Sequence, residues 1–97
     1  MLYFELIGRN ASLFQIPNDL LTIWIGRSAD CEVYLPSPTV AKHHVRFAIR
    51  SGEWLDGLKL ANGIPTKVNG KEVSIPFGII PGDEIEVGEF ILRLRRL

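Results

Sequence analysis

The chain has 97 residues, of which 46% are hydrophobic and 23% are charged. This composition excludes disorder and supplies enough apolar side chains for one packed domain, which we expect to span residues 1–97. Eleven basic residues balance eleven acidic ones. The chain therefore lacks the net positive charge that draws proteins nonspecifically onto nucleic acids or anionic membranes.

Cys31 is the single cysteine of the sequence. This excludes an intrachain disulfide and a zinc site built from cysteines, so we expect packing to stabilise the fold. The first apolar run contains Glu5 and has no basic lead-in, unlike a secretory signal, and no apolar stretch approaches the length that spans a membrane. We therefore expect a cytoplasmic protein, or the cytoplasmic part of a larger one, without membrane insertion.

Short segments of β-branched, aromatic and leucine residues, bounded by Gly, Pro, Asn or Asp, follow one another along the chain. Such spacing is typical of strands, and no window shows apolar residues at helical intervals. The predicted strands are Leu2–Ile7, Leu13–Ile16, Thr22–Ile25, Glu32–Leu35, His44–Ile49, Trp54–Leu60, Lys67–Val68, Glu72–Ile75, Glu84–Val87 and Phe90–Leu94. We expect an all-β fold, a two-sheet antiparallel β-sandwich of about 10–11 short strands.

The clearest alternation lies in the segment that follows His43. Val45, Phe47 and Ile49 share one face of the predicted strand, so that face packs in the core while the other meets water. Further along, the Asn69-Gly70 pair predicts a two-residue hairpin turn. The side chains that we expect to be largely buried are Trp54, Phe47, Ile49, Leu35, Ile85 and Leu92.

Two regions of the sequence carry a pattern of spaced residues. The first has Gly-Arg at the end of a predicted strand, then an Asp, alternating apolar residues, and a basic residue two positions before a histidine: Gly26, Arg27, Asp30, Val33, Leu35, Val40, Lys42 and His44. The second contains Thr66-Lys67-Val68-Asn69-Gly70 and Gly82-Asp83-Glu84-Ile85-Glu86-Val87-Gly88. In order and spacing, this pattern resembles forkhead-associated (FHA) domains over roughly Ile23 to Leu94.

The resemblance implies a forkhead-associated/SMAD-like sandwich that binds phosphothreonine peptides with loops at one end. It also implies a protein-protein interaction module of signalling that is not an enzyme and uses no cofactor. The expected partner is a phosphothreonine-containing protein or peptide, and the chain is expected to belong to a multidomain protein or complex. We expect the loops Gly26-Arg27, Pro38–His43 and Asn62–Thr66 to gather at one end.

The same resemblance assigns roles to individual residues. Arg27 corresponds to the arginine that grips the phosphate, and its guanidinium is a planar fork that pairs with two oxygens at any working pH. Lys42 adds charge to the same phosphate as a flexible point donor. Asn62 and Thr66 complete the expected phosphopeptide-binding set. The residues expected to brace the loops are Gly26, His44 and Asn69.

Two positions depart from the family pattern. Ala41 replaces the serine whose hydroxyl contacts the phosphate, and a methyl group donates no hydrogen bond. Ile64 replaces the asparagine that grips the peptide backbone, and Pro65 after it has no amide; a shifted local alignment would let Asn62 and Gly63 serve instead. These departures predict weak phosphopeptide binding. They also support an alternative, a scaffold or assembly domain that binds its partner independently of phosphorylation.

Catalysis and nucleic-acid binding find less support in the residues. The residues that could supply a Ser-His-Asp catalytic triad are His43, His44, Asp30 and Ser37. Adjacent strand residues point to opposite faces, so we expect the two histidines to share neither a catalytic site nor a metal ion. The arginines near the C-terminal end alternate with leucines, which is typical of a strand with one wet face, and no basic-aromatic interleaving forms a stacking platform.

Overall fold

Residues 2–8, 12–17, 22–49, 58–63, 66–73 and 78–96 are described by the computed structural model. These residues form strands, turns and loops. The strands are β1 (Leu2–Ile7), β2 (Leu13–Ile16), β3 (Thr22–Gly26), β4 (Val33–Tyr34), β5 (Val45–Ile49), β6 (Leu58–Gly63), β7 (Thr66–Val68), β8 (Lys71–Val73), β9 (Gly78–Ile79), β10 (Glu84–Val87) and β11 (Phe90–Arg96). The predicted all-β fold is confirmed. Within these ranges no helix is long and apolar enough to cross a membrane.

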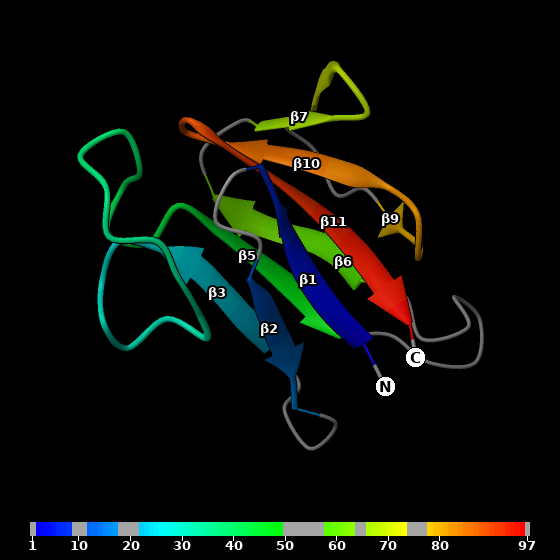
Figure 1. Ribbon diagram of the computed structural model, residues 1–97, viewed down its shortest axis with the longest axis horizontal. Helices are drawn as coiled ribbons and strands as arrows, with labels where there is room; N and C mark the ends of the chain where they lie inside the picture. The colour runs from blue at the N-terminus through cyan, green and yellow to red at the C-terminus, as the bar shows by residue number, and fades with distance from the viewer. Residues whose placement is uncertain are drawn as a thin grey trace.

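The strands form two sheets that face each other as a sandwich (Figure 1). One sheet has six strands in the order β2-β1-β11-β10-β7-β8, and the other has five in the order β4-β3-β5-β6-β9. The first and last strands lie side by side, paired antiparallel from Leu2 opposite Arg96 to Ile7 opposite Ile91. The predicted two-sheet sandwich is therefore confirmed.

One strand pair departs from the antiparallel arrangement that the sequence predicts. β3 and β4 are parallel, with Ile25 opposite Val33 and Gly26 opposite Tyr34. The chain makes this pairing by looping back beside the end of β3, and the Leu35 amide donates to the Gly26 carbonyl at 2.8 Å. Strand β9 was also not predicted, because two residues are too few to show an alternating pattern.

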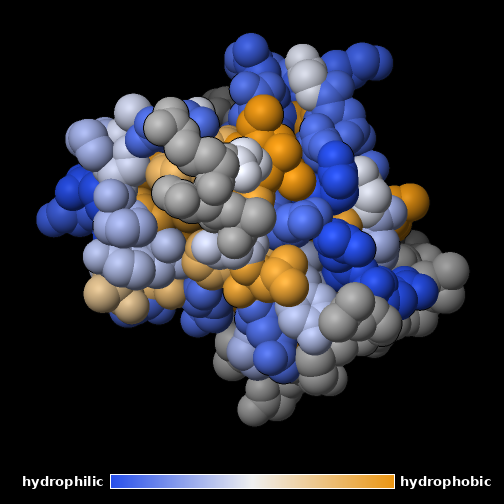
Figure 2. Space-filling model, viewed as in Figure 1, coloured by the Kyte–Doolittle hydropathy of each residue, from blue (hydrophilic) through white to orange (hydrophobic). Residues whose placement is uncertain are grey.

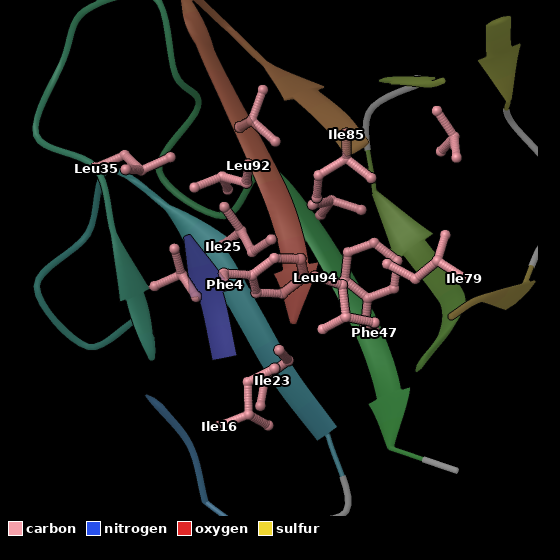
Figure 3. Close-up of a cluster of buried hydrophobic side chains, with 14 of the residues drawn as sticks. Phe4, Ile16, Ile23, Ile25, Leu35, Phe47, Ile79, Ile85, Leu92 and Leu94 are labelled. Carbon is pink, nitrogen blue, oxygen red and sulfur yellow. The ribbon is translucent and has the colours of Figure 1, made fainter. Parts of the chain in front are cut away.

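The core lies between the sheets, where alternate residues of both inner faces meet (Figure 3). The rings of Phe4 from one sheet and Phe47 from the other have centroids 6.1 Å apart, a distance typical of interacting aromatic pairs. The predicted burial is confirmed for Phe47, Leu35, Ile85 and Leu92, all at most 2% exposed. Trp54 and the side chain of Ile49 lie outside the described residues.

The predicted turn at Asn69-Gly70 is confirmed. Val68 lies opposite Lys71 across β7 and β8, which leaves two residues in the turn. Their φ angles are 50° at Asn69 and 84° at Gly70, the left-handed values that a two-residue hairpin turn of this type requires.

Charged side chains on the outer face of the six-stranded sheet pair with one another. Arg93 Nη2 lies 2.5 Å from Glu84 Oε2, and Arg95 Nη1 lies 3.3 Å from Glu5 Oε1. Hydrophilic side chains cover much of the face in Figure 2 and separate its apolar groups. Because both arginines face carboxylates, they are part of a charge-balanced strand surface and not of a basic patch.

Candidate functional site

Strand register brings three segments to one end of the five-stranded sheet. Ile25 near the end of β3 lies opposite Val45 at the start of β5, and Val45 lies opposite Gly63 at the end of β6. The chain after β3, the chain before β5 and the end of β6 are therefore neighbours (Figure 1). Below, "the β3-end loops" means residues 26–32 and 37–44.

Gly26 permits a close approach between the two β3-end loops. A Cβ atom at this position would lie 2.2 Å from the Lys42 carbonyl oxygen and 3.0 Å from Cys31 Sγ. Next to it, the Arg27 amide donates to the Ala41 carbonyl at 2.9 Å, and the Ser28 amide donates to the Lys42 carbonyl at 3.1 Å. The absence of a side chain at Gly26 thus lets the two loops bond through their backbones.

Arg27 and Lys42 are exposed on these neighbouring loops. The Arg27 Nε donates to the Val40 carbonyl at 3.0 Å, which fixes the guanidinium from one side. Its two terminal nitrogens make no hydrogen bond or ion pair with any residue that the structure describes. The Lys42 ammonium likewise has no carboxylate partner among the described residues. Two cations that face solvent on adjacent loops can attract an anionic group.

His44 connects the β3 end to the loop that carries Ala41. It is 8% exposed, and its Nδ1 accepts a hydrogen bond from the Ala41 amide at 3.1 Å. Its own amide donates to the Ile25 carbonyl at 2.9 Å. Burial lowers the pKa of His44, so the imidazole is neutral at neutral pH, with its proton on Nε2 because Nδ1 is an acceptor.

The expected third loop differs from its prediction, because Asn62 and Gly63 belong to strand β6 and not to a turn. Asn62 lies opposite Arg46 and Leu60 lies opposite Phe47, which leaves Ala61 as an extra residue in a bulge. Bulges occur often beside binding sites, where they change the direction of a strand. Ile64 and Pro65 lie outside the described residues.

Thr66 and Asn69 come after β6 in the chain, in β7 and in the turn that follows it. Thr66 is 4% exposed, and its hydroxyl donates to the Glu86 carbonyl. Asn69 Nδ2 donates to Asp83 Oδ1 at 3.1 Å, and Asn69 Oδ1 accepts from the Glu84 amide at 3.0 Å. Thr66 therefore uses its only side-chain donor inside the protein, while Asn69 joins the β7–β8 turn to the turn before β10.

Sequence reasoning missed the contact between the second β3-end loop and the β10–β11 turn. The Ser37 hydroxyl donates to the Glu89 carboxylate, and the Glu89 amide donates to Thr39 Oγ1 at 3.1 Å. Gly88 has a φ of 58°, and a Cβ there would lie 2.6 Å from the Thr39 carbonyl oxygen. The sequence Ser37-Pro38-Thr39 suggests a turn whose hydroxyls bond to nearby backbone groups. Their partner in the structure, Glu89, lies far away in the sequence. Ser37 contacts this carboxylate instead of a histidine, so it does not form a triad.

A second cluster that the sequence did not indicate consists of Asp30, Cys31 and His43. Their potential metal-ligand atoms all lie within 4.8 Å of one another. His43 Nε2 lies 3.2 Å from Asp30 Oδ1, and the Cys31 thiol donates to the Lys42 carbonyl at 3.4 Å. A hydrogen bond from Ser28 and the contact with His43 lower the pKa of Asp30, whereas burial raises the pKa of the Cys31 thiol.

Comparison with known families agrees with this architecture. The sequence model for the FHA domain matches residues 23–88, more than half of the chain. The chain belongs to the FHA domain family. The matched range begins in β3 and ends just after β10, and it includes the β3-end loops of this FHA domain. No curated protein matches the chain by sequence.

Solved FHA domains have the same fold. The FhaA FHA domain in complex with the intracellular domain of Rv3910 is 22% identical, with a TM-score of 0.80 over 98% of this chain and 100% of that one. The yeast Dun1 FHA domain, bound to a doubly phosphorylated peptide derived from Rad53, is 19% identical, with a TM-score of 0.82 over 97% and 72% of the two chains. The N-terminal FHA domain of S. cerevisiae Rad53p, with a phosphothreonine peptide, is 19% identical, with a TM-score of 0.79 over 99% and 93%. At these identities the likeness shows the fold alone.

Proposed function

We propose that this FHA domain is a cytoplasmic interaction module, without catalytic activity, that binds phosphothreonine-containing segments of partner proteins through the β3-end loops and the end of β6. The observation that carries the proposal is Arg27. Its Nε is held by the Val40 carbonyl, and its terminal nitrogens have no partner among the described residues. A guanidinium held in this way can present two parallel N–H donors to a phosphate. Lys42, on the adjacent loop, adds a second positive charge.

Ala41 is the reason to expect weak binding. Its side chain is a methyl group, its amide donates to His44, and its carbonyl accepts from Arg27. Ala41 thus has no donor left for a phosphate. Since a hydrogen bond to a charged group contributes roughly 1.5–3 kcal/mol, the missing hydroxyl costs about ten- to a hundredfold in affinity.

We assign peptide-backbone contact to Asn62, whose position in β6 is opposite the first residues of β5. Thr66 is left out of the proposed contact set, although the sequence suggested it, because its hydroxyl already donates to Glu86. Gly26 and His44 brace the β3-end loops, and Asn69 braces the neighbouring turn.

The experiment is a titration of the protein with paired phosphorylated and unphosphorylated threonine peptide libraries. The phosphorylated members should bind more tightly, Ala41→Ser should increase that affinity about tenfold, and Arg27→Ala should abolish it. Arg95→Ala is the matched control, because Arg95 is an exposed arginine that pairs with Glu5 on the other sheet. It should leave the affinity unchanged.

The lack of a donor at Ala41 also favours a second candidate, a scaffold that binds its partner independently of phosphorylation. The two functions give opposite results in the same titration. Equal binding of both peptide forms, unchanged by Arg27→Ala and Ala41→Ser, would reject phosphate recognition and leave the scaffold.

A further inference from the structure

The cluster of Asp30, Cys31 and His43 joins the two β3-end loops. Asp30 and Cys31 belong to the loop between β3 and β4, whereas His43 belongs to the turn before β5. All three ligand atoms lie within 4.8 Å of one another. One carboxylate oxygen, one sulfur and one imidazole nitrogen thus converge from two separate segments of the chain.

We propose that Asp30, Cys31 and His43 bind one divalent cation of the zinc class. Thiolate, imidazole and carboxylate are the ligands that Zn²⁺ takes from proteins, and three of them with an open fourth position form a recognised coordination type. A soft sulfur ligand argues against Mg²⁺ and Ca²⁺, which prefer oxygen alone. Sequence reasoning expected no metal, because it considered sites built from several cysteines or from both histidines.

The separations suit a small tetrahedral ion. Ligand bonds of about 2.0–2.3 Å place neighbouring ligand atoms roughly 3–4 Å apart in a tetrahedron. The His43 Nε2 to Asp30 Oδ1 distance is already 3.2 Å. The Cys31 sulfur lies no more than 4.8 Å from either of the other two ligand atoms, so a shift of about 1 Å or less brings it within the tetrahedral range. On binding, the Cys31 proton leaves to solvent, a metal-sulfur bond forms, and the hydrogen bond to the Lys42 carbonyl breaks.

The surroundings of His43 favour a fixed ligand direction. The Trp24 indole packs edge-on against the imidazole, with centroids 5.2 Å apart and an interplanar angle of 76°. This contact limits rotation of the ring whose Nε2 faces Asp30. A bound cation would connect the loop that carries Arg27 to the turn that carries Lys42. The ion is thus a structural clamp of the β3-end loops, and it does not depend on phosphopeptide binding.

The test is a Co²⁺ titration of reduced, metal-free protein that carries no affinity tag. Co²⁺ in a thiolate site gives a sulfur-to-metal charge-transfer absorption in the near ultraviolet, which reports on Cys31 directly. We expect this band to saturate at one equivalent and to disappear when Zn²⁺ is added, because Zn²⁺ competes for the same ligands. Zn²⁺ should also raise the melting temperature of the wild-type chain.

The variants separate the site from general effects on folding. His43→Ala changes an exposed residue and should weaken Co²⁺ binding about tenfold or more. Cys31→Ser should remove the charge-transfer band. Glu72→Gln, at an exposed carboxylate on β8, is the control that should bind like the wild type. Absence of the band in the wild-type protein, or a band unchanged by His43→Ala, would overturn the proposal.

Discussion

Two Asn-Gly pairs, Asn62-Gly63 and Asn69-Gly70, have identical side chains but different structures. The second pair is a two-residue turn with positive φ angles at both positions. The first pair ends strand β6, where its backbone lies opposite Val45 and Arg46 of β5. Asn-Gly permits a tight turn, but an adjacent strand with free hydrogen-bonding groups decides whether the turn forms.

The two regions are also held together in different ways. Asn69 is exposed, and it holds its turn with side-chain hydrogen bonds to Asp83 and Glu84. The β3-end loops beside Asn62 depend instead on backbone bonds around Gly26 and on the buried ring of His44. Because unpaired polar groups cost more when they are buried, substitutions of the buried Gly26 and His44 should destabilise the fold more than substitutions at the exposed Asn69 turn.

The largest loss of stability should come from Gly26→Ala. The added Cβ would lie 2.2 Å from the Lys42 carbonyl oxygen, a backbone atom that moves only if the loop moves. We expect the free energy of unfolding to fall by about 3 kcal/mol or more, as measured by urea denaturation. A loss below about 1 kcal/mol would show that the two β3-end loops separate easily.

His44→Ala should be the next largest in effect. It leaves the Ala41 amide without its Nδ1 acceptor in a buried place, and we expect a loss of about 1–3 kcal/mol together with faster hydrogen exchange at that amide. Lys42→Ala, at an exposed residue of the same loop, serves as the control and should change stability by less than about 0.5 kcal/mol. Similar losses for both variants would contradict the role of burial.

Asn69→Ala should cost about 1–2 kcal/mol of unfolding free energy, since alanine is disfavoured at a φ of 50° and the bonds to Asp83 and Glu84 are lost. Asn69→Gly should recover about half of this loss because glycine accepts the positive φ. Chemical denaturation measures both. Phosphopeptide affinity should not change in either variant.

Asn62→Ala should have the smallest effect on stability, below about 0.5 kcal/mol, and a several-fold loss of phosphopeptide affinity, about 0.5–1.5 kcal/mol. Calorimetric titration of the folded variant measures the affinity. The reverse pattern, in which Asn69→Ala weakens the peptide and Asn62→Ala does not, would move the binding surface to the other Asn-Gly pair.

Local patterns in the sequence predicted much of the fold. The alternation through Val45 and Phe47 predicted which face of β5 is buried, and Asn69-Gly70 predicted its own turn. Both features depend on residues that are close in sequence. The position of Gly26-Arg27 at a strand end could be predicted for the same reason.

Contacts between distant segments were beyond local patterns. The Ser37 bond to Glu89 joins residues on opposite halves of the chain, and the parallel β3–β4 pair follows from how a loop folds back. Asn62 was expected in a loop because Asn-Gly permits a turn. No neighbouring residue in the sequence indicates that Asn62 pairs with β5. The convergence of Cys31 on His43 likewise exists only after the sheets have formed.

The pairing of β1 with β11 has a mechanical consequence. Leu2 lies opposite Arg96, so the start of β1 and the end of β11 lie at the same end of the sandwich (Figure 1). The turn at Glu89, by contrast, contacts the β3-end loops at the other end of β11. Tension between the two ends would load the perpendicular β1–β11 hydrogen bonds one after another. The two strands should therefore separate at low force by breaking these hydrogen bonds in order, starting at the Leu2–Arg96 pair, at the end farthest from Arg27.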